Sequence, residues 1–240
     1  MGRDDLKDQL FGELRSFGIG CSSDQADLLL EHMFLVLKKN EHLNLTRIIE
    51  PTDAVTLHIV DSLVPLSFLP LRSGTRFLDL GTGGGYPGIP LAIMTQSNGV
   101  LLDSVGKKVA AVNEFIQSLS LDSVTAEHAR VEDFARAHRS EFDFVFARAV
   151  AQSNVLIEYA SPLLKTHGLL VLEKARPTQQ ELDAAQEACA LCGMSFVSRE
   201  TTELPRDLGH REILIYEKTS APKLKLPRQA GLAKREPLGL

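Results

Sequence analysis

A glycine-rich loop limits what this chain can fold into more than any other feature. The segment "FLDLGTGGGYPGIP", residues 77–90, follows an apolar strand and precedes a helix. Because glycine has no side chain, such a loop lets a ligand approach the backbone closely. At the carboxyl end of the first strand of a doubly wound sheet, that ligand is usually nucleotide-like. The five glycines of the loop are Gly81, Gly83, Gly84, Gly85 and Gly88.

Short apolar segments alternate with helical segments after residue 73, which predicts an α/β fold. Parallel strands need a crossover helix between them, so a mostly parallel sheet with helices on both faces, a Rossmann-like arrangement, is expected. The candidate strands are residues 75–80, 99–103, 123–129, 142–148 and 168–174. The helix expected at 178–193 is followed by two segments that read as an antiparallel strand pair.

The two ends of the chain differ in character from this middle part. Residues 1–73 show apolar residues at helical spacing, as in Leu6, Leu10 and Leu14, and predict an N-terminal helical cap. Residues 74–218 then form the ligand-binding domain. Residues 219–240 are rich in Pro, Lys and Arg without an apolar period, which predicts a basic flexible tail.

Composition excludes several functions. The chain has no apolar run near the roughly 20 residues of a membrane span and no apolar segment near its start, so a cytoplasmic protein is expected. Three cysteines cannot form a disulfide framework, and the seven histidines show no metal-ligand spacing, so no metal is expected. Net charge is −5, but residues 205–240 carry +4. This asymmetry suits a nucleic-acid partner and equally a solvated terminus.

The identity of the nucleotide-like ligand is first weighed from the loop itself. Gly83, Gly85 and Gly88 satisfy the dinucleotide pattern G-x-G-x-x-G, and Asp103 lies 20 residues beyond Gly83. A P-loop is excluded because no Lys-Ser or Lys-Thr follows the glycines. Asp79 argues against a pyrophosphate, because its carboxylate stands just before the loop. A nicotinamide-dependent enzyme stays open, and a cationic nucleoside is favoured.

S-adenosylmethionine is such a ligand, since it combines an ammonium, a sulfonium and an adenosine without phosphate. Asp79 would engage the ammonium, directly or through water and a loop amide. Asp103, ending the second strand, would accept the two ribose hydroxyls. The adenine would lie near Arg130, Val131 and Glu132, after the third strand. A methyltransferase is therefore favoured over a dehydrogenase.

Six blocks of sequence then carry a family resemblance. They are "NEHLNLT", "LHIVDS", "FLDLGTGGGYPGIPLAI", "LLDSVGKKVAAV", "ARVEDF" and "FARAV". In this order and spacing the chain, from about residue 25 to 218, resembles the bacterial small-subunit ribosomal RNA methyltransferase G family, also called glucose-inhibited division protein B. The resemblance implies a class I methyltransferase fold and methyl transfer from S-adenosylmethionine to N7 of one guanine in 16S rRNA, with S-adenosylhomocysteine as product.

The resemblance and the loop together define the candidate site. Guanine N7 carries a lone pair and no proton, so alignment of the reactants, without a general base, is expected to suffice. The catalytic candidates are Arg148, Arg130, Asn44, His58 and Arg211. The cofactor-binding candidates are Asp79, Gly81, Gly83, Gly85, Tyr86 (where the family often has Leu or Phe), Asp103, Ser104, Val131, Glu132 and Arg148.

The partner is expected to be 16S rRNA or a small-subunit particle bound by a monomeric protein. The RNA-binding candidates are Lys107, Lys108, Arg228, Lys234 and Arg235. Removal of the chain after Lys218 is expected to weaken RNA binding and to spare cofactor binding. Two alternatives stay open: a methyltransferase or NAD-dependent enzyme acting on a small molecule, and a non-catalytic rRNA-binding assembly factor.

Overall fold

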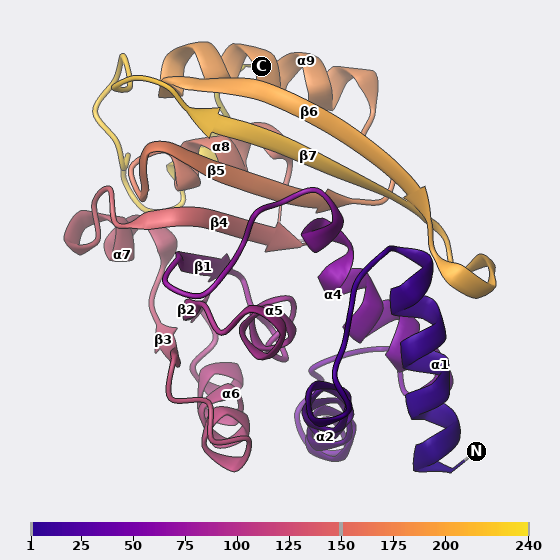
Figure 1. Ribbon diagram of the computed structural model, residues 1–240. Helices are drawn as coiled ribbons and strands as arrows, with labels where there is room; N and C mark the ends of the chain where they lie inside the picture. The colour runs from indigo at the N-terminus through magenta and orange to yellow at the C-terminus, as the bar shows by residue number, and fades with distance from the viewer. Residues whose placement is uncertain (1, 149–150, 240) are drawn as a thin grey trace.

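The computed structural model describes residues 2–148 and 151–239, so Ala149 and Val150 of the "FARAV" block lie outside the described residues. Its centre is a seven-stranded sheet of order β3-β2-β1-β4-β5-β7-β6 (Figure 1). The first five strands in the chain are parallel, and β7 runs antiparallel to both β5 and β6. The strands are β1 (Arg76–Leu80), β2 (Asn98–Asp103), β3 (Val124–His128), β4 (Phe142–Arg148), β5 (Leu164–Lys174), β6 (Met194–Glu203) and β7 (His210–Lys218).

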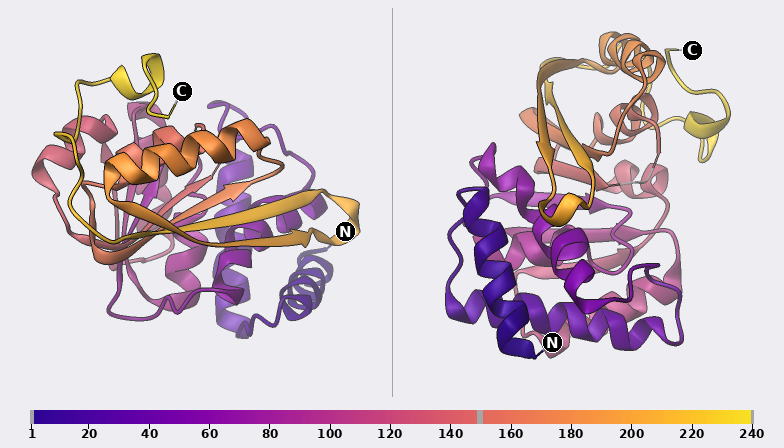
Figure 2. Two further views of the ribbon diagram at one scale, coloured as in Figure 1. Left: turned by 90° about the horizontal axis from the view of Figure 1, so that it is seen from above. Right: turned by 90° about the vertical axis from the view of Figure 1, so that its right-hand side faces the viewer.

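Helices cover both faces of the sheet, as predicted. Side chains alternate along a strand, so Phe77 of β1 enters one apolar cluster and its neighbour Leu78 enters the other. The first cluster lies under the N-terminal helices, α5 (Gly88–Thr95) and α6 (Gly106–Ser118). The second lies under α7 (Val131–Ala137), α8 (Ser153–Ala160) and α9 (Gln179–Cys192) (Figure 2). The predicted Rossmann-like arrangement, a mostly parallel sheet with helices on both faces and a C-terminal antiparallel strand pair, is confirmed.

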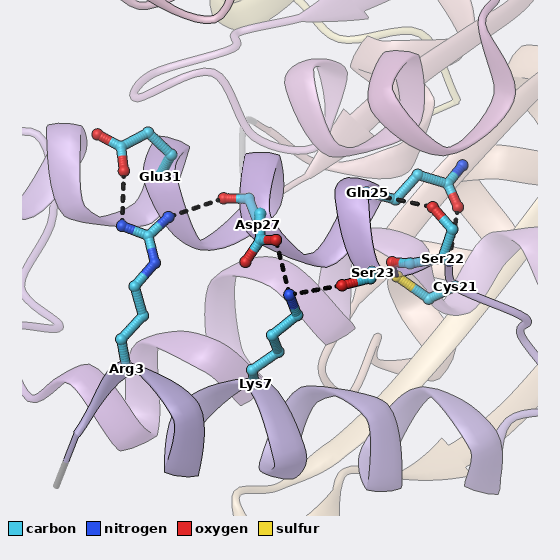
Figure 3. Close-up of polar contacts among 8 residues, drawn as sticks. All are labelled: Arg3, Lys7, Cys21, Ser22, Ser23, Gln25, Asp27 and Glu31. Atoms are coloured by element: carbon cyan, nitrogen blue, oxygen red, sulfur yellow. Dashed lines mark hydrogen bonds and ion pairs between the residues drawn. The ribbon is translucent and has the colours of Figure 1, made fainter.

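The N-terminal cap is helical and shares its core with the sheet. Its elements are α1 (Arg3–Ser16), α2 (Ser23–Asn40), α3 (Pro51–Ala54), a π-helical stretch (Val55–Val60), α4 (Asp61–Leu63) and a 3₁₀ turn (Val64–Ser67). Leu10 and Leu14 of α1 are fully buried. Ion pairs from Arg3 to Glu31 and from Lys7 to Asp27 join α1 and α2 at the surface (Figure 3). Exposed pairs add little stability, so apolar packing holds the cap in place.

The last residues differ from the prediction of a flexible tail, which is wrong for residues 219–239, here called the C-terminal segment. Leu226 and Ala233 are 2% and 1% exposed, and a short helix, α10 (Leu232–Arg235), forms between polar stretches. Arg139 Nη1 also donates to the carbonyl of Leu226 at 2.9 Å. The average composition of the segment did not predict these contacts, because a few apolar side chains are enough to anchor a segment that is polar overall.

Two smaller features affect the site. The helix that follows Pro51 becomes π-helical at residues 55–60, the stretch that carries His58, and π-helical turns are frequent at functional sites. Strand β5 starts at Leu164, earlier than the predicted residue 168, because Leu164 already pairs with Phe142 of β4. No helix among the described residues is long and apolar enough to cross a membrane.

Candidate functional site

The main cavity at the site lies over the carboxyl ends of β1, β2, β3 and β4, and so includes the point between β1 and β4 where the strand order reverses. In open α/β sheets this switch point, at the carboxyl ends of the strands, is where ligands bind. The cavity measures about 330 Å³, within the usual range for small-molecule sites. Its wall includes nine residues of the predicted site and RNA-binding sets: Gly81, Asp103, Ser104, Lys108, Arg130, Val131, Glu132, Arg148 and Lys234. The wall is completed by Leu80, Leu102, Val105, Ala129, Tyr159 and Gly231.

The glycine loop is held over the sheet by backbone bonds and by two carboxylates. The amides of Gly81 and Thr82 donate to the carbonyl of Leu102 at 2.8 and 3.0 Å. The Gly83 amide donates to Asp103 Oδ2 at 3.1 Å. Asp103 Oδ1 accepts from the Val105 amide at 2.9 Å. A carboxylate has about four acceptor positions, so Asp103 at the cavity wall keeps capacity for ligand hydroxyls.

Asp79 does not line the cavity, so the structure contradicts the direct form of its predicted contact with an ammonium, but not the alternative through water and a loop amide. Its side chain is fully buried behind the loop, and Oδ2 accepts from the Gly88 amide at 2.8 Å. A Cβ atom at Gly88 would stand 2.8 Å from that oxygen, so glycine is needed there. Burial raises the pKa of Asp79 to about 6. Asp79 therefore fastens the loop to the start of α5.

A second cavity of about 150 Å³ lies on the other side of the loop. Gly81 and Arg148 line both cavities, so the loop forms a partition between them. The second cavity also receives His58, Tyr86 and Gly83 of the predicted set. Its remaining wall comes from Val36, Leu45, Thr46, Thr82 and Gly84. Gly85 faces neither cavity: it has φ +93°, and a Cβ there would stand 2.7 Å from the side chain of Ile89.

An aromatic stack forms the floor of the second cavity. The ring of Tyr86 lies 4.7 Å from that of His58, nearly parallel to it, and 4.5 Å from that of His32. The guanidinium of Arg148 lies 5.6 Å from the Tyr86 ring centre. Burial, with help from Arg148 and His32, lowers the pKa of His58 to about 3. His58 is therefore neutral at physiological pH, with Nε2 2.9 Å from Thr46 Oγ1.

A charged cluster below this stack was only partly foreseen. Asp61 Oδ1 accepts from Arg211 Nε at 2.8 Å, and Asp61 Oδ2 lies 3.4 Å from Arg148 Nη1. The two arginines belong to the predicted site, but Asp61 was not among the predicted residues. Glu173, which pairs with Arg148 across strands β4 and β5, was missed. Both of its carboxyl oxygens are buried without a partner among the described residues, and burial raises its pKa well above the ordinary value.

The remaining predicted residues divide into surface and buried positions. Asn44 is exposed on the loop after α2, and Arg130 is exposed at the start of α7. Lys107 and Arg235 are exposed outside both cavities, whereas Lys108 and Lys234 line the larger one. Arg228, predicted to bind RNA, turns inward. Its guanidinium forms a two-pronged ion pair with Glu158, whose side chain is 3% exposed, so this prediction is wrong.

The fold and the two cavities define a class I methyltransferase-type α/β protein, and comparison with solved structures agrees. The precorrin-6y C5,15-methyltransferase of Geobacter metallireducens superposes with TM-score 0.53 at 18% identity, covering 66% of this chain and 87% of that one. TYW2 of M. jannaschii, solved in complex with AdoMet, gives TM-score 0.54 at 15% identity, with coverages of 73% and 79%. At such identities the likeness concerns the fold alone.

Sequence comparison identifies the family. The model of the rRNA small subunit methyltransferase G family, GidB, matches residues 25–208. The ribosomal RNA small subunit methyltransferase G of Desulfitobacterium hafniense is 38% identical over 235 residues, which cover 96% of this chain and 97% of that protein. The chain therefore belongs to the rRNA small subunit methyltransferase G family, and the resemblance carried by the six sequence blocks is confirmed.

Proposed function

We propose that this chain transfers a methyl group from S-adenosylmethionine to N7 of a guanine in 16S ribosomal RNA. The observation that carries the proposal is the pair of cavities separated by the glycine loop, with Gly81 and Arg148 on both. A reaction between two bound molecules needs their reacting groups to meet at one place, and such a shared boundary provides it. Family membership supports the rRNA substrate.

The larger cavity suits the cofactor. Asp103 offers a carboxylate to the ribose hydroxyls, while Leu102 and Val131 offer apolar surface to an adenine. Gly81 permits the cofactor to pass close to the backbone, because the residue has φ +84° and no side chain. When bound, S-adenosylmethionine supplies a methyl group on a sulfonium sulfur. The chain's own residues have only to hold it in line with the acceptor.

The smaller cavity suits the acceptor base. Tyr86 and His58 present stacked rings, and aromatic rings are the surfaces on which unpaired bases stack. Arg148 supplies N–H donors that match the O6 acceptor of guanine. Since N7 has a free lone pair, no residue needs to remove a proton, which agrees with a His58 that stays neutral and is not a base. Arg211 acts indirectly, through Asp61, because Asp61 pairs with both Arg211 and Arg148.

The RNA backbone would be held by the exposed and half-buried cations around the larger cavity. Lys107 and Lys108 at the start of α6, Arg130 before α7, and Lys234 with Arg235 in α10 supply positive charge on a chain of net charge −5. Phosphate contacts of this kind set affinity and its salt dependence and carry no sequence information. Binding of a folded rRNA loop within a small-subunit particle would need fewer phosphate contacts than binding of free RNA.

The test measures methyl transfer from labelled S-adenosylmethionine to small-subunit RNA and to particles that lack the modification, with the product base identified by mass spectrometry. Label at guanine N7 of 16S rRNA is expected. Asp103→Ala should raise the Kd of the cofactor, whereas Arg148→Ala should lower kcat with a smaller change in cofactor Kd. Label on another base or on a small molecule, with full cofactor binding, would refute the proposed acceptor. Absence of cofactor binding would refute the proposal altogether.

A further inference from the structure

Two buried carboxylates of the methyltransferase body take their partners from the C-terminal segment. Glu158 of α8 is 3% exposed and accepts from Arg228 Nε at 2.7 Å and from Arg228 Nη2. Glu132 of α7 is 5% exposed, and its Oε1 accepts from the Gly231 amide at 2.7 Å. Charged groups are buried only where they are paired, so these contacts fix the segment against α7 and α8.

Apolar contacts fix the same stretch from within. Leu226 and Ala233 belong to the apolar cluster that α7, α8 and α9 share over the sheet. In Figure 2 the yellow end of the chain lies on the α9 side of the molecule, away from the N-terminal helices. The guanidinium of Arg228 also donates to the carbonyl of Glu236 at 2.8 Å, which closes the segment into a loop around α10. The segment is therefore built into the body on this face.

The stretch fixed in this way reaches the larger cavity. Gly231 and Lys234 line it, next to the turn from Ala129 to Glu132. Gly231 has φ +79°, a conformation that side chains disfavour, and it places its amide on Glu132. The turn that Gly231 contacts comes directly after β3 and lies beyond Asp103 as seen from the glycine loop. In the proposed function this is the adenine end of the cofactor.

We propose that residues 226–236 form the outer wall of the cofactor cavity and bind the adenosine half of S-adenosylmethionine. The inference rests on the proposed function, because it assigns the larger cavity to that cofactor. Glu132 was predicted to lie near the adenine, and one of its carboxylate oxygens accepts from the Gly231 amide. The adenine is then bounded by Val131 on one side and by the segment on the other. Removal of the segment opens the cavity to water.

The test compares the full chain with a chain that ends at Lys218, and measures the Kd of S-adenosylhomocysteine and of 5′-methylthioadenosine by calorimetry. Both ligands carry the adenosine, so we expect both to lose affinity by a similar factor of roughly ten or more, which corresponds to about 1.4 kcal/mol. This replaces the expectation from the sequence that removal of the chain after Lys218 spares cofactor binding, because Gly231 and Lys234 line the cavity. Lys225→Gln is the matched control. Lys225 is an exposed cation of the same segment outside the cavity, and this variant should bind both ligands as the full chain does.

The point variant Arg228→Gln keeps the inference testable if the shortened chain fails to fold. It removes the ion pair with Glu158 and should weaken both ligands by the same factor as each other. Equal affinities in the full chain and in the folded variants would overturn the inference and leave the proposed function in place. A loss confined to S-adenosylhomocysteine would overturn the placement at the adenine end. A full chain that binds neither ligand would overturn the proposed function together with this inference.

Discussion

Asp61 of the N-terminal cap is the shared counter-charge of two arginines of the sheet, and its removal should lower the free energy of unfolding. The residue is 4% exposed and holds Arg211 at 2.8 Å and Arg148 at 3.4 Å, with both arginine side chains 18% exposed. Asp61→Ala leaves two largely buried guanidinium groups without their shared counter-charge. Breaking a buried pair in this way typically costs about 3–5 kcal/mol. Because the arginines keep some contact with water, the lower value, about 3 kcal/mol, is expected here.

The assay is urea unfolding followed by circular dichroism. With a slope of roughly 3 kcal/mol per molar urea, the midpoint should fall by about 1 M. The matched control is Asp53→Ala, which breaks the ion pair with Arg206 between the same cap and the turn that joins β6 and β7. There the two side chains are 36% and 41% exposed, so a loss below about 1 kcal/mol is expected. Equal midpoint shifts in the two variants would refute the reasoning that burial decides the cost.

Three further predictions concern the loop and the buried groups below it. Gly88→Ala places a Cβ atom 2.8 Å from Asp79 Oδ2 and should lose about 1–3 kcal/mol in thermal unfolding, whereas Gly12→Ala, in open space on α1, should not destabilise. A Gly88→Ala chain as stable as the original would contradict the tight fit. Tyr86→Phe removes a buried hydroxyl that has no partner among the described residues, so the free energy of unfolding should stay constant or rise by up to about 1 kcal/mol; a clear fall would reveal a bond to that hydroxyl. Glu173 holds its proton more tightly in the folded chain than in the unfolded chain, so stability should fall as pH rises above its ordinary value of 4.5. In Glu173→Gln the difference in unfolding free energy between pH 5 and pH 8 should be smaller, and an unchanged difference would argue against a buried neutral carboxyl.

The local pattern of apolar and polar residues along the chain was enough to predict most of the fold. The strands at 75–80 and 142–148 carry apolar residues that are buried on both sides, and such continuous runs belong to parallel sheets. The glycine loop lies where the first strand ends because strand, loop and helix are contiguous in the chain. Asp103 was located correctly for the same reason: it ends a strand, and strand ends of a parallel sheet meet at one edge.

Errors arose where a residue's role depends on partners far along the chain. Asp79 and Asp103 are both acids beside the loop, and the sequence does not tell which one faces the cavity. In the structure the Gly88 amide donates a hydrogen bond to Asp79 and holds its carboxylate behind the loop, away from the cavity. Arg228 is one cation among several in a basic stretch, and only the buried Glu158, 70 residues away, turns it inward.

The class of fold, the position of the ligand loop and, through six ordered blocks, the family could all be predicted from the amino-acid sequence. These are properties of contiguous segments, which local spacing records. Only the folded chain shows that two cavities share Gly81 and Arg148, that Glu173 is buried beside an ion-paired arginine, and that Gly231 lines the larger cavity. Burial and charge pairing depend on which distant segments meet, and no local pattern encodes those contacts.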